Sequence, residues 1–319
     1  MLLAIGITAQ RHVSAQQLPQ YTQFSINPYI INPAIAGTED FTYLQASYRS
    51  QWSGFEGAPK TGYLTGHTTI DKRTTGYSHK KFSMERWFSV GGLFSYDETG
   101  PIKQTSGYAT AAYNMPISSN GLRLSVGMNA GLKSYAYNPE GFVENIPDQN
   151  DPSITTATNR TVFDLGIGVW AYSKRVFFGA ASLQLLENDL NNEFSLDQSL
   201  GKGALVRHYY LMAGYKVNFS KDLFLVPSVL IKALPDFQMS YDINAKLVYI
   251  KTYWLGINYR NEDSIAAFAG LLINDRLEVS YSYDLITSPI RNSASGSSEI
   301  LIGFRINKDP KILCPDEFW

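Results

Sequence analysis

The chain has 319 residues, and 27 Lys and Arg against 28 Asp and Glu leave a formal net charge of −1. Charged residues make up 17% and aromatic residues 13% of the chain, whereas soluble domains carry about 25% charged residues. The near-neutral balance argues against a nucleic-acid partner, which requires a basic surface, and the single cysteine excludes a disulfide framework.

Residues 1–15 are predicted to form a secretory signal peptide. The run from Leu2 to Ala9 is mostly apolar, and Val13-Ser14-Ala15 supplies the small residues of a cleavage site. No Lys or Arg precedes the apolar run, so a buried first strand is the alternative interpretation.

Residues 16–38 are predicted to form an ordered turn segment rather than a strand. Asn27-Pro28 and Asn32-Pro33 favour turns, and each proline lacks a backbone donor. Gly37 closes this segment.

Residues 39–307 alternate between apolar and polar side chains almost throughout. From Leu277 to Leu285, for example, every second residue is apolar and the residues between them are polar. A period of two indicates strands with one apolar and one polar face. The pattern predicts fourteen strands at 39–52, 58–71, 87–97, 103–115, 121–135, 161–173, 175–186, 206–219, 222–234, 237–249, 251–260, 263–274, 276–286 and 298–307.

Two architectures fit this alternation, a soluble sandwich and a transmembrane barrel. The polar faces are rich in Gly, Ser and Asn, and aromatic residues gather near strand ends, as at Tyr135, Tyr137, Tyr249 and Tyr253. Both features favour a barrel whose aromatic girdles lie at the membrane interfaces. We therefore expect an all-β fold, a transmembrane antiparallel up-and-down β-barrel of about 14 strands in the bacterial outer membrane.

The connection lengths predict the orientation of this barrel. Outer-membrane barrels have short periplasmic turns and longer extracellular loops. The long connections 136–160, 187–205 and 287–297 would all be extracellular if both termini are periplasmic, and only 72–86 breaks the rule. Residues 16–38 would then lie at the periplasmic mouth or in the lumen, and residues 308–319 would form a periplasmic tail containing Cys314, Pro315 and Trp319.

No motif for catalysis, cofactor or metal binding is found, so we expect no enzyme and no cofactor. Gly166-Ile167-Gly168 lies within a predicted strand, where it would ease curvature. His67 has threonines on its own face, but hydroxyl groups are too common here to indicate a catalytic pair. Asp148, Asn150 and Asp151 are interpreted as a solvated acidic loop rather than a calcium site.

The N-terminal motifs resemble a known family. The order is Pro19 to Phe24 (PQYTQF), Asn27-Pro28, Asn32 to Gly37 (NPAIAG), Arg49 to Trp52 (RSQW) and Gly57 to Pro59 (GAP). Together they resemble the PorP/SprF family of type IX secretion system outer-membrane proteins. The resemblance implies a partner, which would be a secreted type IX substrate or cell-surface adhesin. It also implies contact with periplasmic ring components of the same machinery.

The motif residues have two interpretations, sealing the barrel or contacting the partner. On the barrel model Arg49 and Gln51 point into the lumen, where Arg49 needs a carboxylate or carbonyl partner. Trp52 would lie near the outer interface. The motif residues considered are Asn27, Pro28, Asn32, Pro33, Gly37, Arg49, Gln51, Trp52, Gly57 and Pro59.

Three functions remain open at this point. The first is an accessory barrel that binds a secreted surface protein through loop residues Tyr137, Asn138, Phe142, Asn188, Asn191 and Arg291. The second is a diffusion channel or small-molecule transporter, because fourteen strands lie between filled and open barrels. The third is a soluble secreted adhesin.

Overall fold

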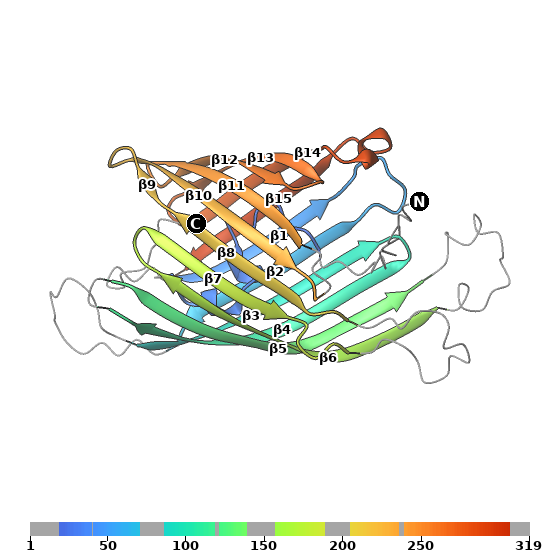
Figure 1. Ribbon diagram of the computed structural model, residues 1–319, viewed down its shortest axis with the longest axis horizontal. Coiled ribbons are helices and arrows are strands. Elements are labelled where there is room, and N and C mark those ends of the chain that lie inside the picture. The colour runs from blue at the N-terminus through green and yellow to red at the C-terminus, as the bar shows by residue number, and fades with distance from the viewer. Residues whose placement is uncertain are drawn as a thin grey trace, which may run out of the picture.

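The chain folds as a closed antiparallel β-barrel in a computed structural model, which describes residues 19–39, 41–70, 86–118, 121–138, 157–188, 205–235 and 239–306. Apart from β8 and β9, which both pair with β10, each strand pairs with its neighbours in sequence, and the last strand returns to the first, with Thr42 opposite Ile306 and Ser50 opposite Ser298. Figure 1 shows the strands around the barrel, tilted relative to its axis. The signal peptide and the tail predicted at 308–319 lie outside the described residues.

The barrel has fourteen strands when β8 and β9, which both pair with β10, are counted as one. The strands are β1 (Thr42–Ser50), β2 (Lys60–Thr69), β3 (Trp87–Thr99), β4 (Ile102–Pro116), β5 (Arg123–Tyr137), β6 (Thr158–Tyr172), β7 (Val176–Leu183), β8 (His208–Tyr215), β9 (Val217–Asn218), β10 (Leu223–Ala233), β11 (Met239–Tyr249), β12 (Tyr253–Arg260), β13 (Ser264–Ile273), β14 (Leu277–Ile286) and β15 (Ser297–Ile306). Three short 3-10 helices are described, η1 (Pro28–Ile30), η2 (Pro33–Ile35) and η4 (Pro289–Asn292).

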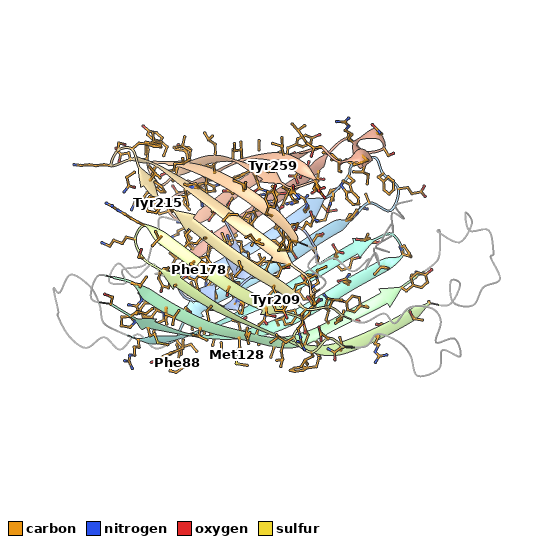
Figure 2. All side chains as sticks on the ribbon, viewed as in Figure 1. Phe88, Met128, Phe178, Tyr209, Tyr215 and Tyr259 are labelled. Atoms are coloured by element: carbon orange, nitrogen blue, oxygen red, sulfur yellow. The ribbon has the colours of Figure 1, made fainter. Side chains whose placement is uncertain are left out.

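The apolar faces of the strands point outward and the polar faces point into the lumen. In β1, Leu44 and Tyr48 are exposed, while Gln45 and Arg49, which directly follow them, are buried. Figure 2 shows the outward side chains, which include Phe88, Met128, Phe178, Tyr209, Tyr215 and Tyr259, all at least 40% exposed. An apolar outer face and a polar interior are the pattern of a barrel surrounded by lipid. The alternative prediction of a soluble adhesin is therefore wrong.

The connections divide between two mouths of the barrel. We call the end where β1 begins and β15 ends the first mouth, and it carries the connections 70–86, 117–122, 173–175, 219–222, 250–252 and 274–276. The second mouth, on the right in Figure 1, carries 51–59, 100–101, 138–157, 184–207, 234–238, 261–263 and 287–296. The longer connections thus gather at the second mouth, apart from 70–86, as the sequence predicts. The membrane orientation of the mouths and termini stays a prediction.

The tight turns at the first mouth use the left-handed backbone region. Asn274 and Asp275 have φ of 50° and 56°, as a two-residue hairpin turn requires. Ile250 and Lys251 have φ of 52° and 55°, although a β-branched residue disfavours this region. The hydrogen-bonded pairing of β11 with β12 therefore holds these two residues in the turn.

None of the helices in the described part of the chain has the length and apolar character needed to cross a bilayer.

Aromatic residues at strand ends follow the girdle prediction only in part. Tyr249 and Tyr253 are 51% and 52% exposed on the outer face. Tyr135 instead shares the lumen face of Lys133, whose Nζ lies 5.1 Å from its ring centroid. The prediction for Tyr135, and for Tyr137 on the same side of β5, was wrong because it used position along the strand and ignored the side to which the residue points.

Candidate functional site

The lumen is occupied by residues 19–39, a segment that we call the plug. Phe24, Ile26, Ala34 and Ile35 are each at most 1% exposed. Helices η1 and η2 both begin at the proline of an Asn-Pro pair, and Asn32 caps η2 by accepting a hydrogen bond from the Ala34 N–H at 3.0 Å. The described part of this segment is thus built of turns and short 3-10 helices, and it lies within the lumen.

The plug rests directly on the barrel wall at two glycines. A Cβ atom at Gly127 of β5 would lie 2.5 Å from the Ala34 nitrogen, and one at Gly168 of β6 would lie 2.0 Å from Asn32 Oδ1. Asn32 also donates to the Val169 carbonyl at 3.0 Å. Gly168 therefore permits this close approach, a role that the prediction of eased curvature had missed.

Gly37 ends the plug near the first mouth. Its φ of +66° favours glycine, and a Cβ there would lie 2.0 Å from Ser89 Oγ. Its carbonyl accepts from Trp87 Nε1 at 2.9 Å, and its N–H donates to His67 Nδ1 at 3.3 Å. His67 thus holds the plug, and no catalytic partner is needed to explain its burial.

Polar side chains of the plug reach several strands. Asn27 donates to Thr65 Oγ1 at 2.9 Å on β2, and Tyr29 donates to Thr110 Oγ1 at 2.7 Å on β4. On the other side, Lys246 of β11 donates to the Ser25 carbonyl at 3.2 Å. Because these contacts surround the segment, it is fixed to the wall on several sides.

Charged groups converge on the plug near the second mouth. Arg49 lies 2.8 Å from Asp284 and 3.6 Å from Glu299, and it donates to Thr22 Oγ1 at 2.7 Å. Thr22 in turn donates to Asp284 through its hydroxyl at 2.8 Å and to Glu299 through its N–H at 2.8 Å. The need of Arg49 for a carboxylate partner in the lumen is confirmed.

The same cluster extends along β10, β11 and β12. Arg260 lies 2.8 Å from Asp242, 2.9 Å from Asp263 and 3.7 Å from Asp284, while Lys232 lies 2.6 Å from Asp242. We call the whole group the mouth cluster; it consists of Arg49, Lys232, Arg260, Asp242, Asp263, Asp284 and Glu299. Only Arg49 could be singled out from the sequence, because the other members are polar residues of alternating strands, or of a turn in the case of Asp263, and resemble many others in the chain.

The remaining motif residues help to order the rim of the second mouth. Gln51 N–H donates to the Pro59 carbonyl at 2.9 Å, and the Gly57 carbonyl accepts from Gly100 N–H at 2.9 Å. Trp52, with φ of 51°, is half-buried in the 51–59 connection, where its N–H donates to Ser297 Oγ at 3.1 Å. The first of these bonds closes the 51–59 connection on itself, and the other two join it to the 100–101 connection and to the start of β15.

The predicted partner-contact residues lie at this mouth where they are described. Tyr137 ends β5 rather than lying in a loop, and Asn138 N–H donates to the Pro101 carbonyl at 2.9 Å. Asn188 donates to the Phe163 carbonyl at 2.6 Å, and Arg291 is exposed in η4. Phe142, Asn191, Cys314, Pro315 and Trp319 lie outside the described residues, as does the acidic loop at 148–151. The partner-contact role of all these residues stays a prediction.

Comparison with known proteins places the chain in a family. The model of the family described as type IX secretion system membrane protein PorP/SprF matches residues 13–304. A search of curated proteins finds no match to this chain.

Solved outer-membrane barrels resemble the structure at low identity. Omp33 of Acinetobacter baumannii is 9% identical over 85% of this chain and 100% of its own, with a TM-score of 0.46. The β domain of the Bordetella autotransporter BrkA is 11% identical over 84% and 98%, with a TM-score of 0.39. A mutant Rh. blastica porin is 10% identical over 83% and 99%, with a TM-score of 0.35. These values give no basis for transferring a function.

The family match covers most of the chain, and the barrel carries the apolar outer band of an outer-membrane protein. The chain is therefore an outer-membrane β-barrel and belongs to the PorP/SprF family of type IX secretion system membrane proteins.

Proposed function

We propose that this barrel is a non-enzymatic accessory protein that binds a cognate secreted surface protein, such as an adhesin, and supports its secretion or attachment to the cell surface. Membership of a type IX secretion family supports a role alongside secreted substrates. The observation that carries the proposal is the plug, because buried residues from Thr22 to Ala36 occupy the lumen and leave the mouths as the surfaces for recognition.

The second mouth is the proposed contact surface and would face the cell exterior. It carries most of the long connections, as expected for the outer side of such a barrel. Its rim is also ordered by hydrogen bonds between connections, for example from Ser53 N–H to the Gly296 carbonyl at 2.8 Å. An ordered rim lowers the entropy that is lost on binding a partner.

Conduction by the barrel, the alternative function, has less support. A channel requires a continuous aqueous path, and the plug contacts nearly opposite walls, through Asn27 with Thr65 of β2 and through Ser25 with Lys246 of β11. We expect the intact barrel to give no steady current in a planar bilayer. A large steady current from the full chain would favour the channel instead.

Affinity purification from detergent-solubilised membranes tests partner binding. We expect the wild-type barrel to retain a secreted type IX substrate. Reversing charge at the exposed second-mouth residue, Arg291→Glu, should reduce this recovery, whereas Lys221→Glu at the exposed first mouth should not. Equal loss with both variants, or recovery of the barrel without any type IX substrate, would contradict the proposal.

A further inference from the structure

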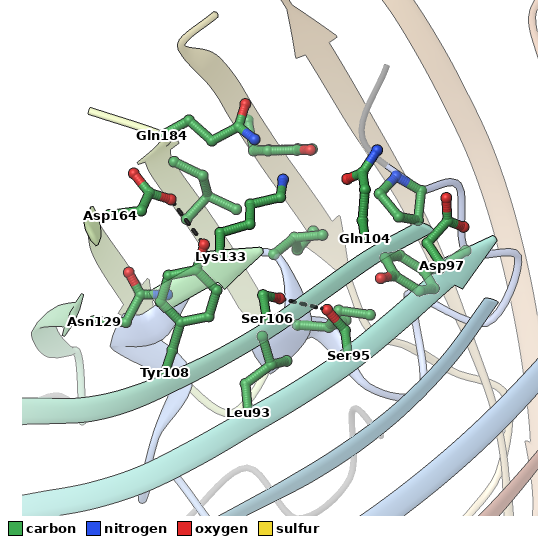
Figure 3. Close-up of a pocket in the computed structure, with 16 residues that line it drawn as sticks. Leu93, Ser95, Asp97, Gln104, Ser106, Tyr108, Asn129, Lys133, Asp164 and Gln184 are labelled. Carbon is green, nitrogen blue, oxygen red and sulfur yellow. Dashed lines mark hydrogen bonds between the residues drawn. The ribbon is translucent and has the colours of Figure 1, made fainter. Parts of the chain in front are cut away.

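A cavity lies between the plug and the wall near the second mouth. Its volume is about 70 Å³, which is enough to hold ordered water. The plug contributes Pro19, Tyr21, Ile30 and Ile31, and strands β3 to β8 contribute the remaining lining apart from Gln184, which directly follows β7. Figure 3 shows the polar residues of this wall around Lys133.

The lining is amphipathic. Ile30, Ile31, Leu93 and Leu183 supply apolar surface. Ionisable groups come from β3, β5 and β6, namely Asp97, Lys133 and Asp164. A ligand that fits both kinds of wall needs an apolar stem and a polar head.

The two carboxylates are buried and incompletely neutralised. Asp164 is 2% exposed; its Oδ2 accepts from Tyr108 at 2.8 Å, while its Oδ1 has no hydrogen-bond partner among the described residues. Asp97 is 9% exposed and accepts from Thr61 at 2.6 Å. These partners are neutral hydroxyl groups, which do not neutralise the negative charge of either carboxylate.

Lys133 compensates only one of these two negative charges. It is 5% exposed, and it forms no ion pair within 4.0 Å in the part of the chain that the structure describes. With the Gln184 amide oriented to donate to the Val206 carbonyl, its oxygen accepts from Lys133 Nζ at 2.6 Å. Two carboxylates and one ammonium leave the cavity with a net charge of −1.

We propose that this cavity binds one lysine or arginine side chain of the secreted partner, an inference that rests on the proposed function. A guest cation brings the net charge to zero, and its methylene stem suits the isoleucine and leucine surface. An acidic guest would face two carboxylates and only one ammonium.

The site also links binding to the plug. Because Tyr21, Ile30 and Ile31 form one wall, an inserted side chain contacts the plug and the barrel together. A guest side chain that binds only when the plug is seated in the lumen stabilises the seated plug over a displaced one.

A peptide-binding experiment tests the site on the full chain in nanodiscs. The probes are acetylated and amidated Gly-Ser peptides that carry one central arginine, norleucine or glutamate. We expect the arginine peptide to bind best. Asp164→Asn and Asp97→Asn should each weaken its binding about tenfold or more, as when a charge-assisted hydrogen bond is lost.

Lys133→Met provides the sharpest test because its effect has the opposite sign. It removes the like charge and should strengthen arginine-peptide binding about tenfold. Glu98→Gln is the control, since Glu98 lies outside the lining and pairs with exposed Lys103 at 3.4 Å. The heat-dependent gel shift of barrels verifies folding; if Asp164→Asn does not fold, the other two cavity variants decide.

Equal binding of the arginine and norleucine peptides would overturn the inference. So would preferred binding of the glutamate peptide together with its loss in Lys133→Met. Recovery of the secreted partner by affinity purification distinguishes failure of the cavity inference from failure of the proposed function. If the wild-type barrel retains its secreted partner while the peptides and cavity variants show no difference, the cavity inference alone fails. If no partner is recovered, the proposed function fails and the peptides still decide the cavity.

Discussion

Replacing Arg49 by methionine tests whether the mouth cluster holds the plug. Methionine keeps much of the length of the side chain but removes the ion pairs with Asp284 and Glu299 and the hydrogen bond to Thr22. The cluster then changes from three cations and four carboxylates to two cations and four carboxylates. Asp284 and Glu299 are 1% and 0% exposed, so solvent does not compensate their charge.

The expected cost is about 3 kcal/mol. Breaking a buried ion pair by removing one partner costs roughly 3–5 kcal/mol, and Arg260 still lies 3.7 Å from Asp284, which favours the lower value. The barrel ladders do not involve the Arg49 side chain. The loss should therefore appear first as local opening of the plug rather than as unfolding of the strands.

Hydrogen exchange of peptides from residues 19–39, measured by mass spectrometry in nanodiscs, reports this opening. A loss of about 3 kcal/mol predicts roughly hundredfold faster exchange in the plug, with little change in β4 and β5. Arg276→Met, at an exposed turn, is the matched control. Adding Glu299→Gln to Arg49→Met should restore part of the protection. Unchanged exchange in Arg49→Met would refute a stabilising role for the cluster.

Three further substitutions test the plug seat and the lipid face. Gly127→Val places side-chain atoms where the Ala34 backbone lies, so we expect a folded barrel with a displaced plug and a measurable current in a planar bilayer, whereas a silent variant would contradict this seat. Asn32→Ala loses the cap of η2 and the bond to Val169; plug exchange should accelerate about fivefold or more, and equal exchange would count against the cap. Ile257→Arg on the outer face, where Ile257 is 60% exposed, should lower the free energy of unfolding in lipid by about 2–4 kcal/mol. An unchanged urea midpoint would argue that this face does not meet lipid.

The strands could be predicted because their signal is local. Alternation from Leu277 to Leu285, for example, gives β14 nearly to the residue. Strand β6 began three residues before its predicted start at 161, since the pairing of Thr158 with Tyr137 extends the ladder beyond the apolar pattern. The sequence pattern alone left the barrel and the sandwich open, because both use the same alternation.

The plug and its anchors could be predicted only in part, because they depend on contacts between distant residues. The Asn-Pro pairs indicate turns, but the choice of the lumen depends on Gly127 and Gly168 across the barrel. The lumen position of Arg49 followed from the barrel model, but its partner Asp284 is 235 residues away. Nothing in the local pattern distinguishes Asp284 from other polar lumen residues.

The position of the plug ties it to the seam where the barrel closes. Thr22 binds Asp284 of β14 and Glu299 of β15, and both carboxylates pair with Arg49 of β1. A segment that is made before every strand of the barrel thus finds its anchors on β14 and β15, 277 residues later in the case of Glu299. The plug can therefore be fully seated only when the final strand has joined the first, and a seated plug marks a completely assembled barrel.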